Sequence, residues 1–192
     1  MFNPILGILA SSGAVAGGSY ESIATTTVGS GGSSTITFSS IPSTYKHLQI
    51  RGIARASSGT YQSDLNIKIN SDTGSNYTLH RLYGDGSTVA AAAATSQTVA
   101  AAGRNAIASA SSTASAFSGI VCDILDYGNT NKYKTIRTLG GYDNNTSSSG
   151  QSQILFSSDL WLSTSAITQL DLTLDSGNFA QYSSFALYGI KA

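Results

Sequence analysis

This sequence contains few charged residues. Only 10% of its residues are charged, against roughly 25% in an ordinary soluble domain. The ten basic and ten acidic residues leave a formal net charge of zero, whereas a protein that binds nucleic acid normally carries a basic excess. Nucleic acid is therefore not a predicted partner. A surface with so little charge repels copies of itself only weakly, which suits a protein that works in an ordered assembly.

Cysteine is nearly absent, and the signals for export or membrane insertion are weak. The single cysteine, Cys122, lies in the strand-like run SGIVCDIL and is predicted to pack as a small buried apolar residue. A secretory signal needs a basic start, whereas the first basic residue is Lys46. The uninterrupted apolar run of residues 5–10 is far shorter than the about 20 residues that span a bilayer. We therefore predict neither an export signal nor a membrane span.

The apolar start of the chain is a candidate docking arm. The segment SSGAVAGGS follows it and has the composition of a flexible tether. We predict an extended N-terminal arm over residues 1–19 that binds a partner. Two alternatives stay open, a segment that joins the core or an oligomer contact, and a disordered end. The predicted partner-binding residues are Phe2, Ile5, Leu6, Ile8 and Leu9.

Apolar and polar residues alternate along several short stretches, which is the pattern of a half-buried β-strand. DLNIKIN places Leu65, Ile67 and Ile69 on one side of the chain, and QLDLTLDS and FSGIVCDIL follow the same rule. Turn-rich segments such as GSGGSS, NSDTGSN and DYGNTN separate these runs. About ten short strands with turns between them predict an all-β fold, a jelly-roll-like antiparallel β-sandwich over residues 20–192.

Residues 88–116 depart from this pattern because they are rich in alanine, serine and threonine. Alanine is the best helix former, but the segment has no amphipathic stripe. We interpret it as a long excursion between two core strands, with an irregular edge strand or a short turn of helix. Its small side chains would allow close backbone approach at an oligomer contact.

Catalytic and metal-binding patterns are weak. The two histidines, His47 and His80, lie in strand-like runs, and no GxSxG motif marks a nucleophile. The loop NSDTGSN has oxygen donors at Asn70, Asp72 and Asn76, but its glycine comes one place earlier than in a calcium loop and no terminal glutamate follows. A hairpin turn is the preferred interpretation, and calcium binding stays an open alternative. The sequence therefore predicts no enzyme, no catalytic residue, no cofactor and no metal site.

Tyrosine is the most frequent aromatic residue, with ten copies. Tyrosine rings among Asn, Asp and Ser residues can bind a sugar or a partner protein. The favoured interpretation is that they cap the ends of a sandwich core with the hydroxyl in water. The tyrosines at or near predicted turns and strand ends are Tyr45, Tyr61, Tyr77, Tyr83, Tyr127, Tyr133, Tyr142 and Tyr182.

Several phrases in fixed order resemble a group of tailed-bacteriophage virion proteins. They are IPSTYKHLQIR, NSDTGSNY, DYGNTNKYKT, WLSTSAIT and the closing LYGIK, spread over residues 20–192. The resemblance implies a jelly-roll-like β-sandwich, usually trimeric, on the outside of a phage particle. It implies a head decoration (cement) protein or a tail-fibre module, and it brings no catalytic residue.

The expected function is that of a capsid decoration protein. It would form a homotrimer on the virion exterior, assemble in the bacterial host cytoplasm, bind the major capsid protein or other virion proteins through its arm, and stabilise the shell. The alternative is a tail-fibre module or a receptor- or glycan-binding knob, with a host surface glycan as partner. A soluble hydrolase on the same fold is the least favoured. The short chain leaves no room for the shaft of a full fibre, which favours the decoration protein.

Overall fold

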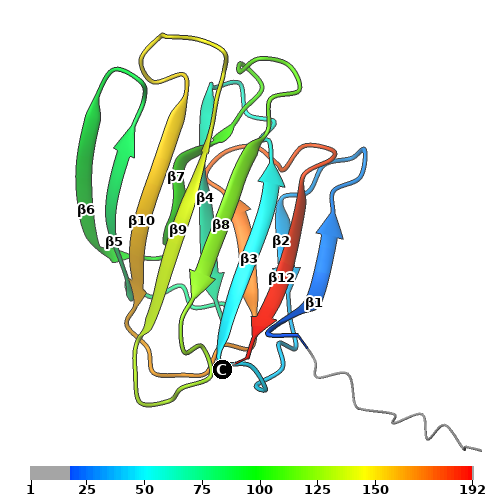
Figure 1. Ribbon diagram of the computed structural model, residues 1–192, viewed down its shortest axis with the longest axis vertical. Coiled ribbons are helices and arrows are strands. Elements are labelled where there is room, and N and C mark those ends of the chain that lie inside the picture. The colour runs from blue at the N-terminus through cyan, green and yellow to red at the C-terminus, as the bar shows by residue number, and fades with distance from the viewer. Residues whose placement is uncertain (1–17, 192) are drawn as a thin grey trace, which may run out of the picture.

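Two antiparallel sheets, one of eight strands and one of four, make up the computed structural model, which describes residues 18–191. The smaller sheet lies behind the larger one in Figure 1. The order across the larger sheet is β1 (Tyr20–Thr27), β12 (Ser184–Ile190), β3 (His47–Ala54), β8 (Ser118–Ile124), β9 (Lys134–Tyr142), β10 (Gln153–Trp161), β5 (Tyr77–Gly84) and β6 (Val89–Gln97). The order across the smaller sheet is β2 (Thr35–Phe38), β11 (Leu170–Leu174), β4 (Gln62–Ile69) and β7 (Ala100–Ala108).

The core lies between the two sheets and follows the predicted alternation. In β4, Leu65, Ile67 and Ile69 are fully buried, while the residues between them are partly exposed. Ile120 and Cys122 on β8 face the same interior from the larger sheet. Each large apolar side chain buried in this way contributes about 1.5–3 kcal/mol. Because a strand has a period of two, the alternation fixes which side of each strand meets the core.

The predicted all-β sandwich is confirmed. The chain passes from one sheet to the other on going from β2 to β3, from β3 to β4 and from β4 to β5. The strands β8, β9 and β10 then run as a meander within the larger sheet (Figure 1). A jelly roll has eight strands, whereas twelve are present over residues 18–191, and the jelly-roll order itself is not confirmed.

The alanine-rich segment forms two strands of the sandwich: the expected edge strand is present as β6, whereas the expected excursion outside the core is wrong for β7. β6 is an edge strand of the larger sheet, but β7 belongs to the smaller sheet and packs against β9 and β10. Ala100, Ala102 and Ala106 of β7 are fully buried. Small residues let β7 lie close to its neighbours, since a Cβ added at Gly103 would come within 2.8 Å of the Cβ of Leu65.

The loop of residues 70–76 crosses between the sheets and is not the predicted hairpin turn. It leads from β4 in the smaller sheet to β5 in the larger sheet. The Asp72 carboxylate accepts hydrogen bonds from the backbone N–H of Gly74 at 2.8 Å and from the indole Nε1–H of Trp161 at 2.7 Å. The bond from Trp161 is the main reason that the pKa of Asp72 is lowered. This carboxylate therefore ties the loop to β10.

Residues 1–17 of the predicted docking arm lie outside the residues that the structure describes. Phe2, Ile5, Leu6, Ile8 and Leu9 all lie outside residues 18–191, so their assignment to a partner stays a prediction. The first strand begins at Tyr20, next to the predicted boundary of the arm. Over residues 18–191, there is no helix of the length and apolar character needed to cross a membrane.

Candidate functional site

The side of the eight-stranded sheet that faces away from the smaller sheet is unusually apolar. We call this side the outer face. On four adjacent strands, β8, β9, β10 and β5, large apolar residues are direct cross-strand partners. We call this set the apolar row, and each member is between 37% and 54% exposed: Val121, Leu139, Phe156 and Leu82.

A second row runs beside the apolar row and mixes glycines with large apolar residues. We call it the glycine row, and it follows the strand register from β3 to β6 as Ile53, Gly119, Gly141, Ile154, Gly84 and Val89. A Cβ added at Gly119 would meet nothing within 4 Å, whereas Gly141 has a φ of 152° and its Cβ would run into the carbonyl oxygen of Gln153. Because the glycines have no side chains, the surface between Ile53, Ile154 and Val89 is depressed. These three residues are between 58% and 78% exposed.

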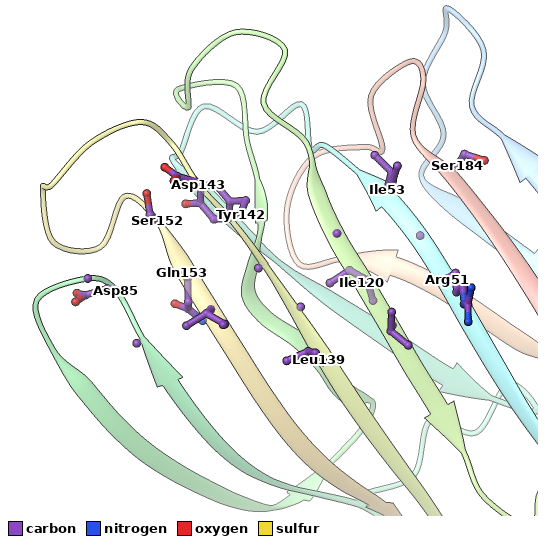
Figure 2. Close-up of a pocket in the computed structure, with 18 of the residues that line it drawn as sticks. Arg51, Ile53, Asp85, Ile120, Leu139, Tyr142, Asp143, Ser152, Gln153 and Ser184 are labelled. Atoms are coloured by element: carbon purple, nitrogen blue, oxygen red, sulfur yellow. The ribbon is translucent and has the colours of Figure 1, made fainter.

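A hollow of about 920 Å³ lies over these glycines (Figure 2). Leu139 and Ile53 lie on its apolar side, and Asp143, Ser152 and Asp85 mark its polar end. The volume is at the upper end of the roughly 300–1,000 Å³ of small-molecule sites. The hollow is open along the sheet and not enclosed, so it resembles a shallow groove in an interaction surface.

Asp85 connects two segments of the chain at the polar end of the hollow. Its carboxylate accepts hydrogen bonds from the Ser149 hydroxyl at 2.6 Å and from the backbone N–H groups of Thr88 at 2.7 Å and Gly150 at 3.1 Å. The bond from Ser149, followed by the bond from Thr88, lowers the pKa of Asp85. The turn between β5 and β6 is thereby joined to the long loop between β9 and β10, and the two segments form one wall.

Polar residues border the apolar row on its other side. We call the set the polar row, and its members are register partners from β3 to β5: Gln49, Asp123, Arg137, Ser158 and His80. The amide of Gln49 donates to Asp123 at 2.7 Å and accepts from Arg51 at 2.7 Å.

Arg51 also packs on aromatic rings at the end of the face near β1. Its guanidinium lies 5.8 Å from the ring centroid of Tyr20 and 5.7 Å from that of Tyr188. Arginine and tyrosine are the residues that most often dominate protein–protein interfaces. The outer face thus combines an apolar centre with a polar and aromatic border, as interfaces do.

The outer side of the smaller sheet provides an internal comparison because it belongs to the same chain. On β2, β4 and β11, its outward residues are polar, and the Thr37 hydroxyl donates to Asp171 at 2.7 Å. Those on β2, β4 and β11 are Thr35, Thr37, Asp64, Asn66, Lys68, Asp171 and Thr173. The two outer surfaces of the sandwich therefore differ sharply, and only the smaller sheet has the surface of an ordinary soluble domain.

On β9 and β10 of the larger sheet, polar residues lie on the inner side, beneath the apolar row. Thr138, Ser157 and Asp159 are at most 1% exposed. Asp159 accepts a hydrogen bond from the Ser157 hydroxyl at 3.1 Å through Oδ2, while its Oδ1 has no partner. Burial raises the pKa of Asp159 to about 7. Burial also raises the pKa of the neighbouring Cys122 thiol to about 12, and this residue packs in the core as predicted.

The two histidines lie at different places on the larger sheet and make different contacts. The Nδ1 of His47 accepts a hydrogen bond from the backbone N–H of Asp126 at 3.0 Å. His80 lies in the polar row as the register partner of Ser158 and Ala93 and is exposed. Over residues 18–191, no three His, Cys, Asp or Glu side chains are grouped so that they could hold a metal ion.

Five of the tyrosines fall into two groups, one in the core and one exposed. Neither the expected binding surface nor the expected cap on the ends of the core describes both groups. Tyr77 and Tyr127 are fully buried and Tyr142 is 7% exposed, so these three belong to the core. Tyr61 and Tyr182 are exposed in two loops at one end of the sandwich. Backbone hydrogen bonds join these loops.

The residues of the outer face were not identified as a site from the sequence. The available signal was that apolar residues occupy both alternations of one strand: in QILFSSDLW, Leu155 and Trp161 face the core, while Ile154 and Phe156 face outward. Apolar residues on both alternations are typical of a strand that is buried on both sides.

No protein-family model, curated protein or solved structure matches this chain in the three comparisons.

Proposed function

We propose that this chain is a structural protein of a tailed-bacteriophage virion, a trimeric decoration (cement) protein that lies on the particle exterior and stabilises the shell. One observation supports a role in assembly above all others: seven large apolar residues are exposed in two adjacent rows of one sheet face. Soluble monomers rarely expose a contiguous patch of this kind. Covering such a face is a strong driving force for association.

The N-terminal arm has a separate role in this proposal. Phe2, Ile5, Leu6, Ile8 and Leu9 carry no charge and precede a tether of small residues. They would bind the major capsid protein or another virion protein, while the sandwich stays outside the shell. Each leucine or isoleucine that becomes buried in the joint would contribute about 1.5–3 kcal/mol.

A receptor- or glycan-binding knob of the virion tail is the second candidate. Tyr61 and Tyr182 are 42% and 70% exposed, and their loops are joined by hydrogen bonds from Ser57 N–H to Asn178 C=O at 2.9 Å and from Ala180 N–H to Arg55 C=O at 2.8 Å. Exposed tyrosines on a fixed loop pair are a feature of sugar-binding and protein-binding surfaces.

The test compares virus particles that carry the chain with particles made without it. Under the main proposal, particles without the chain release DNA at a lower temperature, and added full-length chain restores the shell. A variant without residues 1–19 should fold but fail to join particles. If the chain is not on the particle, or if its loss leaves shell stability unchanged and abolishes adsorption to cells, the decoration role is wrong. Loss of adsorption alone, with binding to a glycan array, identifies the knob.

A further inference from the structure

We infer that the outer face of the eight-stranded sheet is the contact between copies of this chain. This inference rests on the proposed assembly role and adds the partner and the residues of the contact. The patch at its centre consists of the apolar row together with the large members of the glycine row. We call it the apolar patch: Ile53, Leu82, Val89, Val121, Leu139, Ile154 and Phe156.

The area of the apolar patch matches a protein partner. Its members are between 37% and 78% exposed, which leaves roughly 100 Å² of accessible surface on each. The patch thus presents on the order of 700 Å², beyond the roughly 300–600 Å² of the largest patch on a typical monomer. One partner in a standard protein–protein interface contributes about 800 Å². A small ligand in the hollow would leave most of the patch in water.

The shape of the apolar patch also indicates a broad partner. It extends over six neighbouring strands, from β3 through β8, β9, β10 and β5 to β6. At about 4.8 Å between strands, the patch is roughly 24 Å wide. A single extended peptide covers only part of that width. The sheet of a neighbouring copy is broad enough to cover more of it, and the glycine row lets the side chains of that copy approach the backbone.

The charges beside the apolar patch complement a second copy. Asp123 and Arg137 are direct partners in the register between β8 and β9, at the border of the apolar row. Among the described residues, neither takes part in an ion pair. A face that carries both signs side by side can meet a neighbouring copy with opposite charges opposed, which favours self-association over binding to a surface of one sign.

Gly119 offers a direct test because it lies in the middle of the glycine row. A Cβ there meets nothing within 4 Å, and the residue does not have a left-handed φ. Gly119→Leu should therefore leave the subunit folded while its side chain fills the space that the neighbouring copy needs. Gly59→Leu is the matched control, since Gly59 also has open space around it and lies in the loop before β4.

The experiment measures mass and self-association of the full-length chain by sedimentation at micromolar concentrations. Wild type and Gly59→Leu should associate, and Gly119→Leu should associate at least about tenfold more weakly, as expected for a clash at an interface centre. The double variant Leu139→Gln/Phe156→Gln should weaken association as well. Circular dichroism checks that each variant is folded, and if Gly119→Leu is unfolded, the double variant decides.

The outcomes separate this inference from the proposed function. A wild type that is monomeric, or a Gly119→Leu variant that associates as tightly as Gly59→Leu, overturns the inference. So does a full-length Ile5→Ser/Leu9→Ser variant that loses association to the same extent as Gly119→Leu, because the arm would then occupy the face. An assembly of two copies that is sensitive to Gly119→Leu supports the contact but contradicts the trimer of the proposed function.

Discussion

Asp159 gives the chain a predictable dependence of stability on pH. This residue is 1% exposed, and burial raises its pKa in the folded state to about 7, against about 3.9 in an unfolded chain. A carboxyl group with a raised pKa in the folded state stabilises the fold most when it is protonated. Its contribution is complete below about pH 3.9 and is lost as the pH rises towards about 7.

The magnitude follows from the difference between the two pKa values. The full loss is about 4 kcal/mol above pH 7, and about 2.5 kcal/mol of it falls between about pH 5 and pH 8. Asp159→Asn keeps the size of the side chain and an oxygen that can accept from Ser157, but it cannot ionise. The variant should therefore gain stability relative to wild type as the pH rises.

Urea unfolding at several pH values measures this difference in stability. The fluorescence of Trp161 monitors unfolding, and the protein concentration is the same at every pH. All other titratable groups are common to the two proteins, so the difference isolates Asp159. Asp143→Asn is the control, since Asp143 is exposed in the loop after β9 and accepts only a local hydrogen bond, from the Asn145 N–H at 2.7 Å. The reasoning fails if the stability difference between Asp159→Asn and wild type is the same at both ends of the range.

Three further predictions follow from single residues. The Cys122 thiol, with a pKa raised to about 12 by burial, should not react with a thiol reagent at mildly alkaline pH until the chain is unfolded by denaturant. Ile67→Ala, at a fully buried position of β4, should lower the free energy of unfolding by about 2–5 kcal/mol in denaturant titrations. Asp85→Ala should release the wall of the hollow, so that the amides of Thr88 and Gly150 exchange with deuterium faster than in wild type while the core amides do not change.

The fold class could be predicted because the physical signal is local. A strand with one side in the core and one in water must alternate, as β4 does with Leu65, Ile67 and Ile69. The same holds for β8 and β11. The burial of Cys122 followed from its place in such a run. None of these conclusions required knowledge of which strands are neighbours.

The pairing of strands could not be predicted because it depends on distant parts of the chain. The segment NSDTGSN has the composition of a turn, and composition does not tell a hairpin from a crossing between sheets. Its path depends on the bond from Trp161 to Asp72, whose partners are 89 positions apart. The alanine-rich strand β7 was missed for a similar reason, since its place in the core depends on how closely it packs against β9 and β10.

The two sides of β10 show why the outer face is apolar. Ile154 and Phe156 face outward on this strand, while Ser157 and Asp159 lie inside, with one oxygen of Asp159 left without a partner. Turning the strand over would bury these two apolar residues, but it would expose Leu155 and Trp161, which face the core. A strand with apolar residues on both alternations therefore leaves some of them on the outer side in either orientation. Contact with another copy of the chain would remove these residues from water, and this is the contact that we propose.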